Sequence, residues 1–179
     1  MSAYQFFEVQ VADGIATVTM NRPPVNVLNL PMVTELNALL EAVLSDTNLA
    51  AFVLRANGKA FSAGVDVADH AADKVGEMIR QFHGVCRKLL ATDALTIAVV
   101  NGAALGGGCE LALCCDIVLA SERAKFGQPE VHLAVFPPVA ACVLPAQVGI
   151  KKAIELNALG AVIEAPEAHR IGLANQVFP

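Results

Sequence analysis

The sequence is poor in charged and aromatic residues. Of its 179 residues only 16% are charged, tryptophan is absent and tyrosine occurs once. Twelve Lys and Arg residues stand against seventeen Asp and Glu residues, which gives a formal net charge of −5. Because a nucleic-acid-binding surface requires a basic footprint, this balance argues against DNA or RNA as a partner.

The chain also lacks the cysteine and leader patterns that would indicate metal binding or secretion. Its five cysteines are odd in number, and the adjacent Cys114 and Cys115 suit neither a zinc site nor a disulfide framework. The first ten residues contain no basic region followed by an apolar one, as a secretory signal requires. We therefore expect reduced, mostly buried thiols in a cytoplasmic protein.

The chain is instead rich in hydrophobic residues. They make up 55% of the chain, and the mean hydropathy is +0.55. The strongest candidate for a membrane span, residues 94–115, contains Asn101, Glu110 and three consecutive glycines, whereas a span needs about 20 mostly apolar residues. We expect instead a single domain over residues 1–179, with much apolar surface buried in its core or against other subunits.

Hydrophobic periodicity predicts strands that alternate with helices, which is the α/β class. Two strands joined at Asp13-Gly14 form a predicted hairpin, and a strand at 95–100 is apolar enough to be covered on both faces. Strands are expected at 6–11, 15–20, 51–54, 95–100, 116–120 and 174–178, and helices at 31–43, 75–89, 108–113, 140–148 and 151–159.

Three consecutive glycines at 106–108 lie between the predicted strand at 95–100 and a short helix. The first N–H groups of a helix have no intrahelical partner and carry the positive end of its dipole. Such a turn stabilises an anion, for example the enolate oxygen of a reacting thioester. The alternative is close packing of helix against strand, which also requires small residues. The spacing matches neither dinucleotide-binding nor P-loop glycine motifs.

Two carboxylates and a second glycine turn complete the candidate site. Glu110 lies in an apolar stretch, where it is either a partner of the helix dipole or an acid–base group with a pKa set by burial. Glu130 ends a tight Phe-Gly-Gln-Pro-Glu loop. Gly64 either presents the Val65 amide to a ligand or forms an ordinary turn. Ser62 as a nucleophile lacks a recognisable His–acid pair.

With these segments, the sequence resembles the crotonase superfamily of enoyl-CoA hydratases and isomerases. The resemblance runs from Asn21-Arg22-Pro23 with Asn26 to Gly172-Leu173-Ala174, and residues 101–116 followed by 126–130 carry it most specifically. It implies a spiral of ββα units, assembled as homotrimers or hexamers. It further implies an acyl-CoA substrate, with coenzyme A as part of the substrate and no separate cofactor or metal.

The resemblance also assigns roles by position. Val65 and Gly107 would supply the two amides of an oxyanion hole, Glu130 would exchange a proton with the substrate carbon, and Glu110 would position and activate water. The presence of both glutamates favours a hydratase. The alternatives are an isomerase that uses Glu130 alone and a catalytically silent protein that binds CoA thioesters. Residues expected along the substrate or its coenzyme A are Lys59, Ala60, Phe61, Ala63, Asp66, Val67, Gly106 and Pro138.

Two segments depart from the usual family pattern. Many hydratases are glycine-rich where this chain reads Val-Phe-Pro-Pro-Val-Ala-Ala at 135–141. Together with residues 61–70, this segment is similar to hydratases that act on cyclohexa-1,5-diene-1-carbonyl-CoA in aromatic degradation. Family members also continue beyond the position of Pro179, so we expect the C-terminal helical region to be missing. His70 and His83 lie in or near a predicted helix that could border the acyl pocket, but a histidine on a helix face is usually structural or exposed, and we interpret the histidines in this way.

Overall fold

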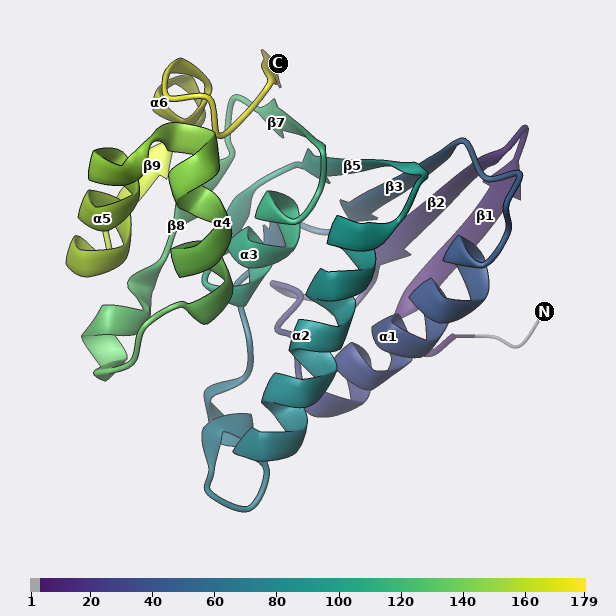
Figure 1. The fold of residues 1–179 in the computed structure, drawn as a ribbon, viewed down its shortest axis with the longest axis horizontal. Coiled ribbons are helices and arrows are strands. Elements are labelled where there is room, and N and C mark those ends of the chain that lie inside the picture. The colour runs from purple at the N-terminus through teal and green to yellow at the C-terminus, as the bar shows by residue number, and fades with distance from the viewer. Residues whose placement is uncertain (1–3) are drawn as a thin grey trace.

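The computed structural model describes residues 4–179, whose secondary structure repeats a strand–strand–helix unit (Figure 1). The first two repeats are β1 (Phe7–Ala12), β2 (Ile15–Met20) and α1 (Leu30–Leu44), then β3 (Ala51–Ala56), β4 (Ala60–Ser62) and α2 (Val75–Ala91). The next two are β5 (Leu95–Val100), β6 (Ala103–Leu105) and α3 (Gly107–Leu113), then β7 (Ile117–Ser121), β8 (Lys125–Gly127) and α4 (Pro138–Val148). This order confirms the predicted crotonase-like spiral of ββα units.

Shorter elements complete the chain. Two 3-10 turns, η1 (Val67–His70) and η2 (Pro129–Leu133), precede α2 and α4. After α4 come α5 (Ile150–Leu159), β9 (Val162–Glu164), α6 (Ala165–Arg170) and β10 (Gln176–Phe178). Within residues 4–179, no helix is both long and apolar enough to span a bilayer.

The strands form two sheets. The larger has the order β1-β2-β3-β5-β7-β10, antiparallel at β1–β2 and parallel elsewhere. The smaller has the order β4-β6-β8-β9, with β4, β6 and β8 parallel and β9 antiparallel. Because β4, β6 and β8 are parallel neighbours, the segments that follow them emerge at the same end of the small sheet. Ligands of open parallel sheets bind at this end.

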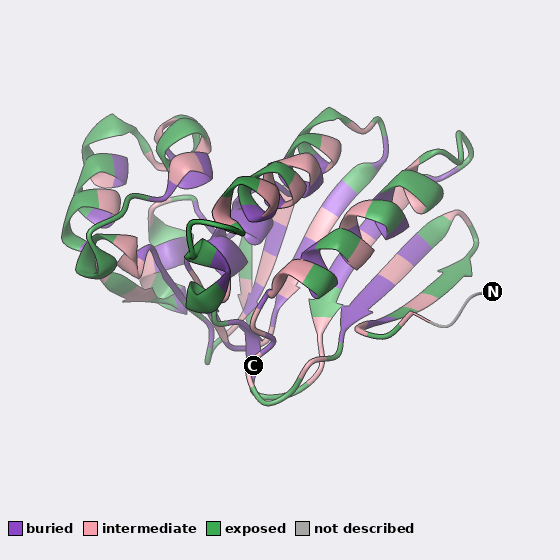
Figure 2. Ribbon diagram, turned by 90° about the horizontal axis from the view of Figure 1, so that it is seen from below, coloured by how far each residue is buried: buried purple, intermediate pink, exposed green. Residues whose placement is uncertain are grey.

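The main core lies between the large sheet and the helices α1 and α2, which cover one of its faces (Figures 1 and 2). The strands bury every second residue against these helices. Side chains that are at most 1% exposed include Val18, Met20, Phe52, Leu54 and Val100 from the strands and Met32, Leu36, Leu39 and Leu40 from α1.

The prediction that the strand at 95–100 is covered on both faces is wrong for this chain. Its even-numbered residues are buried, but Leu95 is 43% exposed and Ile97 and Val99 are only half-buried. One face of β5 packs on helices, and the side chains on its other face remain partly accessible to solvent. The apolar, β-branched residues therefore predicted the strand correctly, but they did not show that only one of its faces is buried.

Local sequence explains how the first repeat forms. Asp13 and Gly14 both have positive φ, at 52° and 74°, as a tight turn between antiparallel strands requires. The Asn29 side chain accepts a hydrogen bond from the Met32 amide at 3.2 Å and caps the start of α1. The helix ends at Leu44, one residue beyond the predicted end, and Ser45 is its C-cap. These contacts confirm the predicted hairpin and first helix.

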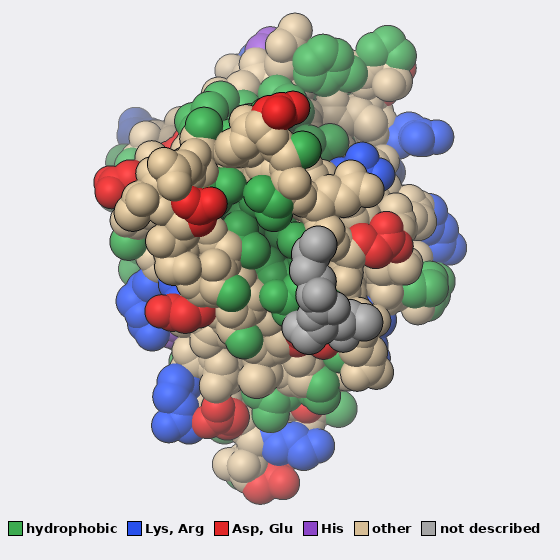
Figure 3. Space-filling view, turned by 90° about the vertical axis from the view of Figure 1, so that its right-hand side faces the viewer, with side chains coloured by type: hydrophobic (Ala, Val, Ile, Leu, Met, Phe, Trp, Pro, Cys, Tyr) green, Lys and Arg blue, Asp and Glu red, His purple; other side chains and the backbone are tan. Residues whose placement is uncertain are grey.

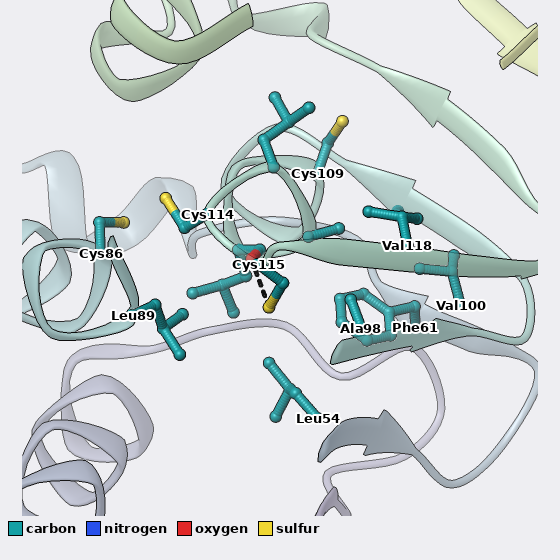
Figure 4. Close-up of a cluster of buried hydrophobic side chains, with 14 of the residues drawn as sticks. Leu54, Phe61, Cys86, Leu89, Ala98, Val100, Cys109, Cys114, Cys115 and Val118 are labelled. Atoms are coloured by element: carbon teal, nitrogen blue, oxygen red, sulfur yellow. Dashed lines mark hydrogen bonds between the residues drawn. The ribbon is translucent and has the colours of Figure 1, made fainter. Parts of the chain in front are cut away.

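Four of the five cysteines are buried, and all five are free thiols. Cys109, Cys114 and Cys115 lie on and just after α3, and Cys86 faces them from α2 (Figure 4). Burial raises the pKa of the Cys109 and Cys115 thiols well above their usual value. Such thiols are poor nucleophiles, so these side chains serve as core packing, as predicted.

Apolar side chains also remain on the surface. Figure 3 shows the side of the molecule that carries β1, where hydrophobic side chains gather in a central hollow among charged ones. At the hairpin, Val11 is 59% and Ile15 43% exposed. Ile150, Ile154 and Leu159 of α5 are each at least 60% exposed. Part of the high mean hydropathy is therefore surface rather than core.

Candidate active site

The segments that follow β4, β6 and β8 meet around a cavity of about 610 Å³. Helix α2 closes one side of it, and the residues between η2 and α4 close another. From the strand ends come Ala63, Gly64, Val65, Gly106, Gly107, Glu110, Pro129 and Glu130; from α2 come Val75, Met78, Ile79 and Phe82. The remaining wall includes the apolar residues Leu133, Phe136 and Pro138.

Glu110 is held at the wall of this cavity by the start of another helix. It lies in the first turn of α3 and is 3% exposed. Its Oε1 atom accepts hydrogen bonds from the amides of Val139 and Ala140, both at 2.9 Å, in the first turn of α4. Burial raises the pKa of Glu110 to about 7, against the lowering effect of these two bonds, and the charge of Glu130 raises it further.

Glu130 faces the same cavity from the first turn of η2. Its Oε2 atom is buried and has no hydrogen-bond partner among residues 4–179. Burial raises the pKa of this carboxyl too, while the charge of His70 opposes the shift. Two carboxyls whose pKa values are raised by burial and that face one cavity are candidates for an acid–base pair.

Two backbone amides approach each other at the floor of the cavity. A Cβ built on Gly107 would lie 3.4 Å from the Val65 nitrogen, and one built on Gly64 would lie 3.5 Å from the Gly107 nitrogen. Gly107 begins α3, so its N–H has no intrahelical acceptor. Among the hydrogen bonds of the described residues, none uses the Val65 N–H. Two such donors can bind one oxygen that gains negative charge.

The loop between β2 and α1 is bonded to the segment that leads through β4 to Val65. Asn26 is fully buried, and its Nδ2 atom donates to the carbonyls of Asn57 and Ala60, both at 2.9 Å. It has a φ of 50°, which asparagine tolerates better than most residues. Sequence reasoning found Asn26 only through the family resemblance, because the two carbonyls that accept from its Nδ2 atom lie more than 30 residues away.

The structure brings together some of the predicted substrate contacts and separates others. Glu110, Glu130, Val65, Gly107, Ala63, Val67, Gly106 and Pro138 all line the cavity. Lys59, Ala60, Phe61 and Asp66 do not. Phe61 is fully buried in the core, and the Asp66 side chain accepts a hydrogen bond from the Ala68 amide, which caps η1. A role of these four residues in binding coenzyme A stays a prediction.

Two histidines that were interpreted as structural or exposed also line the cavity. His70 extends from the end of η1, and its Nδ1 atom lies 3.2 Å from the Asp66 carbonyl oxygen. His83 lies on α2, and burial together with the charge of Arg87 lowers its pKa. Within residues 4–179, no three His, Cys, Asp or Glu side chains are grouped so that they would hold a metal ion.

Comparison with known proteins gives a consistent result. Residues 10–179 match the family model described as enoyl-CoA hydratase/isomerase. The chain is 39% identical over 181 residues to the crotonyl-CoA hydratase of Syntrophomonas wolfei, covering 98% of this chain and 70% of that protein. It is 38% identical over 162 residues to the cyclohexa-1,5-dienecarbonyl-CoA hydratase of Thauera aromatica, covering 90% of this chain and 63% of that protein.

A solved structure with the same fold is Pseudomonas aeruginosa DspI, which superimposes with a TM-score of 0.94 at 32% identity. The superposition covers 99% of this chain and 70% of that one. The chain therefore spans about two thirds of the length of the proteins that it matches.

Proposed function

The chain belongs to the enoyl-CoA hydratase/isomerase family, and we propose that it adds water reversibly to the carbon–carbon double bond of an enoyl-CoA or dienoyl-CoA thioester. One observation carries this proposal: two carboxyls with raised pKa values and two converging amides line the same apolar cavity. These groups are what polarising a thioester and moving two protons require.

The amides of Val65 and Gly107 would hold the thioester carbonyl oxygen. As hydroxide adds to the β-carbon, the electron pair of the double bond moves toward the α-carbon and the carbonyl oxygen, which gains negative charge. Donors that are already in place stabilise this charge without having to reorganise during the reaction. Both amides belong to backbone next to glycine, which lets the substrate approach closely.

The two glutamates would move the protons. Glu110, held by the amides of Val139 and Ala140, would take a proton from water while that water's oxygen bonds to the β-carbon. Glu130 would give a proton to the α-carbon. The sum adds one H and one OH, so no redox partner is needed. We likewise propose that the reaction uses no metal and no cofactor other than the coenzyme A of the substrate.

An isomerase would need only the carboxyl that moves protons between carbons, which is Glu130. The observation against this alternative is the position of Glu110, buried in the same cavity with a pKa raised to about 7. Burying a carboxylate costs free energy. Hydration uses Glu110 to activate water, whereas isomerisation has no chemical role for it.

For the acyl group, we propose a cyclic diene such as cyclohexa-1,5-diene-1-carbonyl-CoA as a substrate to test beside crotonyl-CoA. The Thauera aromatica relative and the Pro137-Pro138 segment support the cyclic acyl group. The Syntrophomonas wolfei relative, at a similar identity, supports the short straight chain. The aliphatic and aromatic walls of the cavity, from Met78 to Phe136, suit either.

The experiment is a product assay with both thioesters, offered separately to the purified protein. Hydration of the cyclic diene would support the aromatic-degradation role. Hydration of crotonyl-CoA alone would keep the hydratase proposal and contradict the cyclic acyl group. If neither thioester gains water but both bind, the chain is a CoA-thioester-binding protein and the proposal fails.

Assembly and location stay proposals from the family resemblance. We propose homotrimers or hexamers, which light scattering on the purified protein would test. The exposed apolar residues Ile150 and Ile154 on α5 are among those that subunit contacts would cover. We propose a cytoplasmic location, which fits the free thiols.

A further inference from the structure

Ser62 connects two segments that the proposed oxyanion hole depends on. It is fully buried at the end of β4, three residues before the Val65 amide. Its Oγ atom donates to the Asn26 carbonyl at 2.8 Å and accepts from the Gly64 amide at 3.1 Å. These two bonds use the hydroxyl in both directions, which explains why this serine is not free to act as a nucleophile.

The orientation of the Val65 N–H is set by the peptide unit that it shares with the Gly64 carbonyl. In a planar trans peptide the C=O and N–H groups point in opposite directions. The Leu28 amide donates to the Gly64 carbonyl at 2.9 Å, and the Asp66 amide donates back to the Leu28 carbonyl at 3.0 Å. Holding the carbonyl on the Leu28 side aims the Val65 N–H at the cavity.

Gly64 is the hinge of this arrangement. Its φ is +101°, in a region that other residues rarely adopt, and a Cβ there would lie 2.9 Å from the Leu105 carbonyl oxygen. The position therefore requires glycine, which is also the residue with the least restricted backbone rotation. Rotation about the Gly64 N–Cα bond would move the Val65 amide. The amide on one side of that bond is held by Ser62, and the carbonyl on the other by Leu28.

We propose that Ser62 is a positioning residue, whose hydroxyl locks the Gly64 hinge so that the Val65 N–H stays aimed at the thioester oxygen. This inference rests on the proposed function. The hydroxyl is anchored because Asn26, whose backbone carbonyl accepts the hydrogen bond from Ser62, is itself held by side-chain bonds to Arg22, Asn57 and Ala60. A chain of contacts thus runs from the β2–α1 loop through Ser62 to the reaction centre.

Ser62→Ala is the variant that tests the hydroxyl alone. Alanine keeps the Cβ that packs closely against Gly108 and removes only Oγ. The matched control is Ser121→Ala, because the Ser121 hydroxyl also donates to a backbone carbonyl, that of Asn101 at 3.0 Å. Ser62→Cys, whose thiol is a weaker donor and acceptor, is the second variant if Ser62→Ala fails to fold.

The readout is the absorption of bound 4-dimethylaminocinnamoyl-CoA, an enoyl thioester that absorbs at longer wavelength when its carbonyl is polarised. At saturation, we expect Ser62→Ala to show at most half of the parental red shift. We also expect its hydration kcat to fall about tenfold, with KM within a factor of two. Ser62→Cys should give an intermediate shift, and Ser121→Ala the parental values.

Parental red shift and kcat in Ser62→Ala would overturn the inference, and so would equal losses in Ser62→Ala and Ser121→Ala. The spectrum separates this test from that of the proposed function. A parent protein that red-shifts the probe but hydrates no thioester contradicts the hydratase proposal, while the comparison of variants still tests Ser62. A parent that produces no red shift overturns both.

Discussion

The Glu130 carboxylate occupies the space that a side chain at Gly106 would need: a Cβ built on Gly106 would lie 2.7 Å from the Glu130 Oε1 atom. Gly106 also has a φ of +50° and a ψ of −126°, which non-glycine residues avoid. The glycine before α3 therefore does two things. It gives the chain its turn into the helix, and it makes room for a carboxyl that comes from a segment more than 20 residues away.

Gly106→Ala should therefore displace Glu130. We expect kcat for enoyl-CoA hydration to fall by about a hundredfold or more, because a misplaced acid–base group loses most of its contribution. Gly149→Ala is the matched control: its φ is also positive, at +80°, but no atom lies within 4 Å of the added Cβ. Steady-state kinetics on both variants check this, and equal losses in the two would contradict it.

The raised pKa of Glu110 predicts a pH-dependent gain in stability for Glu110→Gln. Burial moves the pKa from 4.5 to about 7, so the folded state binds this proton more tightly than the unfolded state. Ionisation of Glu110 therefore lowers the free energy of unfolding. This loss is absent below pH 4.5, where the carboxyl is protonated in both states, and is complete above pH 7. Removing the charge should raise the free energy of unfolding, relative to the parent, by on the order of 3 kcal/mol at pH 8.

Urea unfolding of parent and variant at pH 4.5 and pH 8 measures this difference. Glu35→Gln provides the matched control, because the half-buried Glu35 carboxylate also accepts two backbone amides, from Gln5 and Phe6. The gain in the free energy of unfolding, relative to the parent, should grow from pH 4.5 to pH 8 more for Glu110→Gln than for Glu35→Gln. If it grows equally in both variants, burial is not what raises the Glu110 pKa.

The absence of a required metal is tested by removing metals from the purified protein. We expect dialysis against EDTA to leave the hydration rate within experimental error, because amides and carboxyls supply the polarisation and the proton transfers in the proposed mechanism. Loss of activity that returns on addition of Zn²⁺ or Mg²⁺ would show that the mechanism lacks a component.

Much of the large sheet and its helices was predictable, because apolar residues in these segments recur with a clear period. The predicted helix at 31–43 corresponds to Leu30–Leu44, and the predicted strands at 15–20 and 95–100 have the observed bounds. The small sheet was not predicted. Its strands β4, β6, β8 and β9 have three residues each, which is too short for a period of two to be recognised.

The site was predictable as a set of residues but not as a geometry. Glycine turns and carboxylates pointed to Val65, to the glycines at 106–108, to Glu110 and to Glu130, and the family resemblance singled out Gly107. Val65, Gly107, Glu110 and Glu130 all line one cavity. The contacts that hold Glu110 come from amides 29 and 30 residues away, at the start of a helix that has no side-chain cap. Contacts between distant backbone groups leave no local pattern in a sequence.

The measurement that tests the central claim most directly is hydration of crotonyl-CoA in H₂¹⁸O by the parent, Glu110→Gln and Glu130→Gln, with products identified by mass spectrometry. We predict a 3-hydroxyacyl product that carries one solvent oxygen, formed at least about a hundredfold more slowly by either variant. A parent that only moves the double bond, incorporates no ¹⁸O and is unaffected by Glu110→Gln would contradict the account and identify an isomerase.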